Sequence, residues 1–546
     1  MKNDEIKRWL KKVVSPYKKS ILAITAASVS ATVLSVAFAY LAKFLVNYAV
    51  AGEREKTIAF AIVLAVCVLL RILFRTFVKY YAEKTRTKIS VGLRDGAFSS
   101  ILKAEYSLIG KYHSGEIVTR ATQDSAEIAA ATVSITPSVV GMAVQTAGSL
   151  AALFLIDGVF TSILLAGGII VIGITAASRK KLKKYQSEIM SADEKSRSFM
   201  QESVFSAVTI KSYGAEEKAA RISGEISGDY AKKRIKRAKF NSAANALYSL
   251  VSNFGLLFAI IWCATGAFSG AADYGAVLSV VLLMEQLQRP FTSFSSVIPV
   301  YYSRLACAER LFEIYNLEEE EPSEECAEPD FDKICVEGVS FGYGQKQVLS
   351  DVSFTVSEGE TVLLSGESGA GKTTLALLLL GIYKPTEGSV FIEKNGKRTA
   401  MNKSTRSLFA YVPQGNFVLS GTIFDNVAFF CDKKGAELEK TVKNALSVSD
   451  ADFVYSLPNG LETRLGERGA GLSEGQIQRI ALARAIASGR PILLLDEFAS
   501  ALDSASEQRV LSNVKQLGGI TCITISHGVL AEKYADRKAV IRRIET

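Results

Sequence analysis

Six apolar stretches in the first 300 residues constrain the fold most strongly, because each has about the 20 helical residues needed to cross the hydrocarbon core of a bilayer. The stretches cover residues 20–46, 57–78, 131–156, 159–177, 243–268 and 275–300. Proline interrupts helix interiors, and it is absent from residues 17–136 and 138–289. We therefore predict an α-helical domain with six membrane spans.

The distribution of charge predicts the orientation of these spans. The chain has a net charge of +9, and its Lys and Arg residues are concentrated in the N-terminal arm and in residues 84–120 and 179–239. The connections at 157–158 and 269–275 contain neither Lys nor Arg. By the positive-inside rule, the N-terminus and the two long connections are cytoplasmic. This distribution accounts for the positive charge without nucleic acid, so we expect no nucleic-acid partner.

The segments that flank the spans carry further predictions. The first 14 residues predict an amphipathic helix at the membrane interface, with Lys and Arg reaching the headgroups. Residues 57–104, as one helix, would extend roughly 70 Å, well beyond a bilayer. Residues 112–124 and 206–217 fall where such stalks turn back, and they are either loop tips or short docking helices.

A change in composition divides the chain. A linker at residues 317–332, which is acidic and contains proline, separates a membrane domain at 1–316 from residues 333–546. In the second part, short β-branched runs alternate with helical patterns, which is typical of an α/β domain. The seven cysteines are scattered singly, which favours a reducing compartment over a disulfide framework or a zinc site.

A glycine-rich turn in the α/β domain predicts a phosphate-binding loop. The sequence SGESGAGKTTLALLL at 365–379 follows a predicted strand and opens a predicted helix. It satisfies the pattern G-x-x-x-x-G-K-[ST], in which Lys372 reaches the β- and γ-phosphates and Thr373 ligates Mg²⁺. The expected ATP-binding loop comprises Gly366, Glu367, Ser368, Gly369, Ala370, Gly371, Lys372, Thr373 and Thr374.

A second motif, PILLLDEFASALD at 491–503, is an apolar strand that ends in two acidic residues. We expect Asp496 to organise Mg²⁺ through water and Glu497 to polarise the attacking water as a general base. An acidic pair at the end of a strand has many explanations by itself. The phosphate-binding loop in the same domain favours the catalytic explanation for this acidic pair.

Together these motifs resemble the ATP-binding cassette (ABC) family, specifically its exporters with fused membrane and nucleotide domains. The sequence LSEGQ at 472–476 resembles the family signature, which grips the γ-phosphate of ATP held by the P-loop of a different nucleotide domain. The resemblance implies that Ser473, Gly475 and Gln476 contact ATP across a dimer. Glu474 departs from the family pattern, where glycine is commonest, and its carboxylate would weaken γ-phosphate binding unless it points away.

The resemblance also implies roles for residues outside the two main motifs. Tyr343 matches the aromatic residue that stacks on adenine, and Gln414 matches the glutamine that contacts Mg²⁺ and the membrane domain. Asp503 lies in the segment that communicates across the dimer, and His527 matches the histidine that hydrogen-bonds the γ-phosphate. The implied catalytic residues are Glu497, His527 and Lys372. The implied Mg²⁺ ligands are Thr373, Gln414 and Asp496.

These assignments imply an ATP hydrolase coupled to transport, with ATP and Mg²⁺ as cofactors. The expected activity is export of a drug-like, lipid or peptide solute from the cytosol or inner leaflet by alternating access, with two ATP sites shared in a dimer. The expected partners are membrane lipid, the solute and a second half-transporter, and a homodimer is preferred to a heterodimer. The expected location is the inner membrane of a bacterium. The alternatives are one half of a heterodimeric exporter and an ATP-gated channel or regulator.

Ionisable residues inside the spans are the candidates for a transport cavity, because charge within a membrane is costly unless it has a function. On this ground we select Glu285 and Arg289 in the sixth stretch, together with the polar Gln288 beside them, and Arg71 and Arg75 in the second stretch are further candidates. The alternative for Glu285 is a buried ion pair with an arginine of a neighbouring helix.

Overall fold

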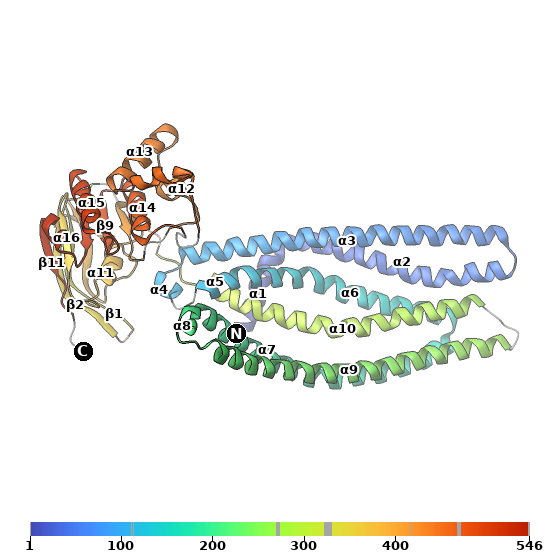
Figure 1. Ribbon diagram of the computed structural model, residues 1–546. Coiled ribbons are helices and arrows are strands. Elements are labelled where there is room, and N and C mark those ends of the chain that lie inside the picture. Colours follow the sequence, from blue (N-terminus) through green and yellow to red (C-terminus); the bar gives the residue numbers. More distant parts are fainter. Residues whose placement is uncertain are drawn as a thin grey trace. The chain divides into compact units, whose positions relative to one another are not determined.

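The chain folds into a helical unit and an α/β unit (Figure 1). The helical unit comprises Met1–Ser99 and Ser114–Asn316, and the α/β unit comprises Ser100–His113 and Leu317–Thr546. The structure is a computed structural model. It describes residues 2–110, 112, 114–268, 274–321, 330–344, 346–415, 418–466 and 471–543.

Long helices make up the helical unit. They are α1 (Lys2–Val14), α2 (Lys18–Val50), α3 (Arg54–Lys103), α5 (Ser114–Thr119), α6 (Ser125–Ile156), α7 (Gly158–Phe205), α8 (Ala207–Ser212), α9 (Glu216–Phe268) and α10 (Tyr274–Tyr315). A 3₁₀ turn at Ser15–Tyr17 joins α1 to α2. Each of the six predicted apolar stretches lies within one long helix, namely α2, α3, α6, α7, α9 or α10. The prediction of one helix over 57–104 agrees with α3, which begins three residues earlier, at Arg54, and ends one residue earlier, at Lys103.

Within the described residues, three helical segments are long and apolar enough to cross a membrane. They are Asp4–Val50, Arg54–Lys103 and Gly115–Ile156, and shorter apolar helical segments lie at Ser249–Trp262 and Tyr274–Gln288. Only 6% of the apolar part of α3 is buried in the single chain, as expected for a surface that contacts lipid or another subunit. Several crossings are therefore supported, and the count of six stays a prediction.

The structure corrects the predicted turn at residues 112–124. There α5 continues through a π-helical turn at Arg120–Asp124 into α6, so most of this segment is the beginning of a long helix. The isolated short helix lies earlier, at α4 (Tyr106–Ile109), within the α/β unit. The other predicted turn contains α8, as a docking helix would require.

Specific polar contacts align the helices of the helical unit. At the start of α10, the Gly275 N–H donates to Asn47 Oδ1 over 2.8 Å, and a Cβ atom on Gly275 would lie 2.0 Å from the carbonyl oxygen of Lys43. Only glycine permits this approach of α10 to α2. At the turn between α6 and α7, Asp157 accepts hydrogen bonds from Phe160 N at 2.9 Å and from Trp262 Nε1 at 2.8 Å, which ties the turn to α9.

Two larger sheets and a short hairpin form the α/β unit. The antiparallel sheet has the order β2-β1-β4-β5 and contains β1 (Lys333–Tyr343), β2 (Lys346–Ser357), β4 (Glu387–Lys394) and β5 (Lys397–Ala400). The parallel sheet has the order β11-β3-β10-β9-β6 and contains β3 (Thr361–Ser365), β6 (Phe409–Val412), β9 (Ile492–Asp496), β10 (Thr521–Ile525) and β11 (Arg537–Val540). The strands β7 (Gly421–Thr422) and β8 (Arg464–Leu465) pair separately.

The helices of this unit pack around separate apolar cores. They are α11 (Lys372–Leu379), α12 (Ile423–Ala428), α13 (Gly435–Val448), α14 (Glu474–Ala487), α15 (Ser504–Gln516) and α16 (Val529–Tyr534), with 3₁₀ turns at Thr405–Leu408, Asp452–Ser456 and Gly460–Glu462. One core joins the two sheets to α11, with Leu364 and Leu375 at its centre. Another joins α12 and α13 to one face of α14, with Ile423 and Leu446. The opposite face of α14 packs on the parallel sheet and α15.

Residues 100–113 belong to the α/β unit because they bind the segment that follows α10. The Glu105 N–H donates to the Glu318 carbonyl at 3.0 Å, and the Glu320 N–H donates to the Lys103 carbonyl at 2.9 Å. The Tyr106 ring lies 6.0 Å from the Tyr383 ring in an edge-on arrangement. The end of α3 and α4 are therefore anchored to the domain that carries the phosphate-binding loop.

Candidate functional site

The phosphate-binding loop lies between β3 and α11, as the sequence predicts. Gly371, which precedes α11, has φ of +89°, and a Cβ atom there would lie 2.7 Å from a methyl carbon of Leu349. A Cβ atom on Gly366 would lie 2.4 Å from the carbonyl oxygen of Ile541. Gly371 is thus required by its backbone conformation, and Gly366 is required by the close approach of the Ile541 backbone. Glu367, Ser368, Gly369 and Thr373 are exposed, while Ala370, Lys372 and Thr374 are buried.

The buried Lys372 ammonium is held by three acceptors. Its Nζ donates to the carbonyl oxygens of Gly366 at 2.9 Å and Glu367 at 3.0 Å, and it lies 3.0 Å from His527 Nε2. Because an ammonium group only donates, Nε2 of His527 is the acceptor in this contact. The structure therefore brings the predicted lysine and histidine into direct contact, although they are 155 residues apart.

Neighbouring parallel strands bring the other predicted catalytic residues to the same edge. The strands β3, β10, β9 and β6 are adjacent, and the loops at their carboxyl ends carry Lys372, His527, Glu497 and Gln414. Gln414 Nε2 donates to Glu497 Oε2 at 2.6 Å, and Glu497 Oε1 lies 3.9 Å from His527 Nε2. Ligands of α/β sheets bind at this edge, outside the carboxyl ends of the strands.

Glu497 has an unusual backbone conformation for a glutamate. Its φ is +49°, in the left-handed region, and its N–H donates to the Ile525 carbonyl at 2.9 Å. Such strain in a residue other than glycine is typical of functional sites, where the surrounding structure maintains it. The conformation turns the Glu497 side chain toward Gln414, while the preceding Asp496 remains buried.

The surroundings of Asp496 indicate whether these residues could hold Mg²⁺. It is 1% exposed, and neither carboxylate oxygen has a hydrogen-bond partner among the described residues, although the Thr373 and Tyr411 hydroxyls lie nearby. Burial raises the pKa of Asp496 above its usual value. A divalent cation with oxygen ligands would satisfy this carboxylate. The described residues contain no cluster of three or more metal-binding side chains, so phosphate oxygens and water would have to complete the coordination.

Tyr343 is suitably exposed for stacking on a base. Its side chain is about half exposed, its hydroxyl lies 3.3 Å from Thr374 Oγ1, and its ring packs edge-on against Phe341 and Tyr383. Burial, together with the neighbouring Tyr343 and Tyr106 side chains, raises the pKa of Tyr383 to about 12. This aromatic cluster, Tyr106, Phe341, Tyr343 and Tyr383, joins the candidate adenine site to α4. Neither Tyr106 nor Tyr383 lies in a motif that could be recognised from the sequence.

The signature-like turn caps α14. Ser473 Oγ accepts from the Gln476 N–H at 3.3 Å, and Gln476 Oε1 accepts from the Ser473 N–H at 2.9 Å, which forms a reciprocal capping box. Ser473 and Glu474 are exposed. A Cβ atom on Gly475 would lie 2.6 Å from the carbonyl oxygen of Ala501. The turn therefore packs tightly on the segment that follows Glu497 and presents its serine outward.

Asp503 has a structural role that differs from its predicted one, and Gln478 has a structural role that was not predicted. Asp503 caps α15 through hydrogen bonds from Ala505 N at 3.1 Å and Ser506 N at 2.9 Å, so its carboxylate is already engaged. Gln478, which sequence reasoning missed, donates to Ser500 Oγ at 3.0 Å and accepts from the Ala501 N–H at 3.2 Å. These contacts couple α14 to the segment between Glu497 and Asp503.

The predicted cavity residues are only partly described. Glu285 is exposed and Gln288 is half-buried in the single chain. The side chain of Arg289 lies outside the described residues. Residues 467–470, which precede the signature-like turn, also lie outside them.

Comparisons with known proteins agree with this architecture. The family model described as the ABC transporter transmembrane region matches residues 21–291, and the model described as ABC transporter matches residues 349–500. An ATP-dependent lipid A-core flippase of Photobacterium profundum is 29% identical over 461 residues, which cover 83% of this chain and 78% of the flippase. A putative multidrug export ATP-binding/permease protein of Bacillus subtilis is 26% identical and covers 98% of this chain and 94% of its own length.

A solved structure shares the fold. It is a bacterial Atm1-family ABC exporter with ATP bound, and it matches with a TM-score of 0.79 at 24% identity over 98% of this chain and 95% of that one. One membrane region and one ATPase domain occur in one polypeptide, which is a half-transporter arrangement. The chain is therefore a multi-pass membrane protein of the ABC transporter family, an exporter that couples ATP hydrolysis to transport.

Proposed function

We propose that two copies of this chain form an exporter in the inner membrane of a bacterium, and that it moves an amphipathic, lipid-like or drug-like solute outward. The relatives named as a lipid A-core flippase and as a putative multidrug exporter support this class of solute. Each ATP, with Mg²⁺, would bind between the P-loop of one copy and the signature turn of the other. Lys372 and Ser473 are the residues that would contact its phosphates from the two sides.

One observation carries the dimer proposal. The contacts of Lys372 are with Gly366, Glu367 and His527, whereas the hydrogen bonds of the Ser473 side chain stay within its own helix cap. Separate apolar cores position the two turns. Among the described residues, therefore, no contact closes the signature turn over the P-loop of the same chain, and a second copy would supply the missing half.

An exposed apolar surface on the second connection supports the same proposal. Phe205, Val208 and Tyr213 surround α8 and are 87%, 84% and 82% exposed. Apolar side chains this exposed in a cluster mark an interaction site. We assign this surface to the α/β unit of the second copy, since it lies on a cytoplasmic connection of the proposed topology.

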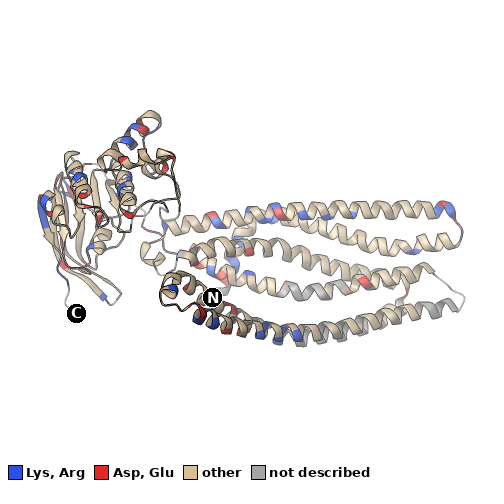
Figure 2. Cartoon of the chain, in the orientation of Figure 1, with Lys and Arg blue, Asp and Glu red and all other residues tan. Residues whose placement is uncertain are grey.

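The charge distribution supports the proposed orientation. Lys and Arg are concentrated in the half of the helical unit that holds α1 and α8, and few lie in the opposite half (Figure 2). By the positive-inside rule, the first half faces the cytoplasm together with the N-terminus and the ATPase domain. ATP would then close the two ATPase domains, and hydrolysis with Glu497 as general base would release them. Only stronger binding of ATP to the closed state drives such a shift.

Mixed dimers test whether the ATP sites are shared. In a dimer of one Lys372→Ala copy and one Ser473→Ala copy, shared sites leave one site with both wild-type halves. In a dimer of one copy carrying both substitutions and one wild-type copy, shared sites leave none. Two affinity tags allow each mixed dimer to be purified, and ATP hydrolysis is then measured. We expect activity in the first dimer only, whereas sites contained within one chain would give activity in the second only.

The solute class is tested in proteoliposomes. We expect labelled phospholipids or amphipathic dyes to stimulate ATP hydrolysis and to move across the bilayer in an ATP-dependent manner. The Glu497→Gln variant controls for passive movement. Stimulation of ATP hydrolysis by peptides alone would contradict the proposed solute class and indicate a peptide exporter. ATP-gated ion conductance without solute movement would contradict export.

A further inference from the structure

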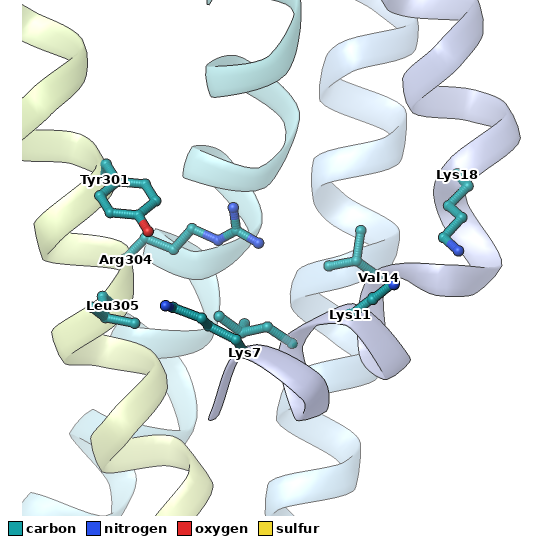
Figure 3. Close-up of a pocket in the computed structure, with 8 residues that line it drawn as sticks. Lys7, Lys11, Val14, Lys18, Tyr301, Arg304 and Leu305 are labelled. Carbon is teal, nitrogen blue, oxygen red and sulfur yellow. The ribbon is translucent and has the colours of Figure 1, made fainter. Parts of the chain in front are cut away.

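A cavity of about 270 Å³ lies where α1 crosses α10, beside the start of α2. It is lined by residues of all three helices: Lys7, Leu10, Lys11, Val14, Lys18, Tyr301, Arg304 and Leu305. Figure 3 shows Arg304 extending from α10 across the space above α1, while Lys7 extends from α1 toward α10. The cavity is close to the lower end of the size range of small-ligand sites, and it suits a headgroup better than a single ion.

The cavity is strongly cationic. Three lysines and Arg304 line it, and no Asp or Glu is among its lining residues in the part of the chain that the structure describes. Lys7 pairs with Asp4 at 3.9 Å, but both side chains are largely exposed, so this pair neutralises little of the charge. An anion bound here would meet four cations and no competing carboxylate from the cavity wall.

Arg304 is the least satisfied of these cations. Its Nε is buried and has no hydrogen-bond partner among the described residues. Burial lowers the pKa of Arg304, and the neighbouring Tyr301 acts in the opposite direction. A partly desolvated guanidinium that pairs with no carboxylate among the described residues is costly, and its planar donors match the oxygens of a phosphate group.

The packing of α1 fixes the shape of the cavity. Ile6 and Leu10 are buried, and the Trp9 ring packs edge-on against Phe312 at 5.7 Å and Tyr315 at 5.2 Å. The apolar face of the predicted interfacial helix is thus bound to α10, which sequence reasoning did not anticipate. Leu10, Val14 and Leu305 leave an apolar side to the cavity.

The position of the cavity indicates the source of the anion. Lys18 is the first residue of α2, and the first predicted span begins two residues later. The cavity therefore lies at the level where a membrane-spanning helix leaves the hydrocarbon core. Lysines in this position reach the headgroups of anionic lipids, and the apolar side of the cavity faces the part of a lipid below its phosphate.

We propose that this cavity binds the phosphate group of an anionic phospholipid, such as phosphatidylglycerol, from the leaflet in which α1 lies. Arg304 and the Tyr301 hydroxyl donate to the phosphate, and Lys7, Lys11 and Lys18 surround it. Because the lipid links α1, α2 and α10, its binding stabilises the arrangement of these helices. The site is separate from the nucleotide site, and the proposal holds whichever solute is transported.

The test measures lipid binding to the delipidated full-length dimer by native mass spectrometry, with a parallel thermal unfolding assay. Wild-type protein is titrated with phosphatidylglycerol or with phosphatidylcholine of the same acyl chains. The cavity variant is Lys7→Gln/Lys11→Gln/Lys18→Gln. Its matched control is Arg8→Gln/Lys12→Gln/Lys19→Gln, which removes the same charge from exposed residues of α1 and α2 outside the cavity. Glycerol phosphate and inorganic phosphate test a soluble source of the anion.

We expect phosphatidylglycerol to bind and to raise the unfolding temperature more than phosphatidylcholine does. The cavity variant should bind phosphatidylglycerol at least about tenfold more weakly, because each lysine near an anionic surface contributes severalfold. The control variant should stay within about twofold of wild type. Arg304→Gln should weaken binding more than Arg304→Lys, since the lysine keeps the charge.

Three results would overturn the proposal. Equal binding of the two lipids by wild type would show that the net negative charge of the headgroup is not recognised, since both lipids carry the phosphate. Equal loss in the cavity variant and its matched control would show that only the total charge matters. Saturation by glycerol phosphate or inorganic phosphate at the concentration effective for the lipid would assign the cavity to a soluble phosphate compound instead.

Discussion

The Nζ atom of Lys372 lies 3.0 Å from Nε2 of His527, at the position where the phosphates of ATP are expected to bind. With the carbonyl oxygens of Gly366 and Glu367, the imidazole completes a set of three acceptors for the ammonium. Bound ATP would replace these acceptors with phosphate oxygens. The lysine and the histidine would then contact the same phosphate group rather than each other.

His527→Ala is therefore expected to impair turnover more than binding. Loss of a donor to the developing charge lowers kcat by about 10²- to 10³-fold, as for other preorganised donors. ATP affinity should fall less, because the phosphate-binding loop is unchanged. The measurements are steady-state hydrolysis and binding of a fluorescent ATP analogue, and His527→Gln should recover part of the rate. Equal rates for His527→Ala and wild type would contradict a phosphate contact.

Glu497→Gln is expected to reduce ATP hydrolysis by at least about 10²-fold, which is typical for removal of a general base. The glutamine keeps the size of the side chain and still reaches Gln414, which lies 2.6 Å from the carboxylate. ATP should therefore remain bound, and the dimer should stay closed. Retention of radiolabelled ATP after gel filtration checks this outcome. The exposed Glu358→Gln is the control, and hydrolysis at the wild-type rate in Glu497→Gln would exclude the base assignment.

The residues that the sequence predicted well are those whose positions follow from local rules. The P-loop and the acidic pair each adjoin a strand of the parallel sheet, and the carboxyl ends of neighbouring strands must meet at one edge. Lys372 and His527 are in contact because the strands that precede them are neighbours in the sheet. That strand order could be expected from the family resemblance. Helix lengths were predicted equally well, as α3 shows, because exclusion of proline and continuous apolarity are local properties.

The features that could not be predicted from the sequence depend on contacts between segments that are far apart in the chain. The pairing of Asp157 with Trp262 spans 105 residues, and no local pattern relates them. Tyr106 meets Tyr383 only because residues 100–113 bind the segment after α10. Ser473 and Gln476 had a readable signal, since S-x-x-Q before a helix is a capping pattern. The same two residues also match a phosphate-binding motif, so one short pattern is compatible with both roles.

Gly475→Ala is expected to separate the signature turn from the segment it packs on. The added Cβ atom would lie 2.6 Å from the carbonyl oxygen of Ala501, and a backbone atom cannot move aside as a side chain does. The cost is about 1–3 kcal/mol, as in other overpacked sites, and hydrolysis should fall at least about tenfold because Ser473 is displaced. Gly224→Ala, with open space around its helical glycine, is the control. Unchanged ATP turnover in Gly475→Ala would show that the turn tolerates displacement.

Asp496→Asn is expected to raise the stability of the metal-free protein and to abolish ATP hydrolysis. Burial raises the pKa of this carboxylate despite the neighbouring Thr373 and Tyr411 hydroxyls, so its charge destabilises the protein when Mg²⁺ is absent. In EDTA without nucleotide, the variant should therefore be more stable than wild type, by about 1–2 kcal/mol, since a neutral amide costs less to bury. Wild type should gain stability on addition of Mg²⁺ and ATP through ligand binding, whereas the variant should gain little and hydrolyse no ATP.

Thermal unfolding of the full-length protein in detergent, with and without Mg²⁺ and ATP, measures both effects on Asp496→Asn. The control is Asp452→Asn, because Asp452 is exposed and its charge is solvated by water in both conditions. An Asp496→Asn variant that is less stable than wild type in EDTA would show that the carboxylate is satisfied without metal. In that case the burial of Asp496 would no longer support a Mg²⁺ site at the end of β9.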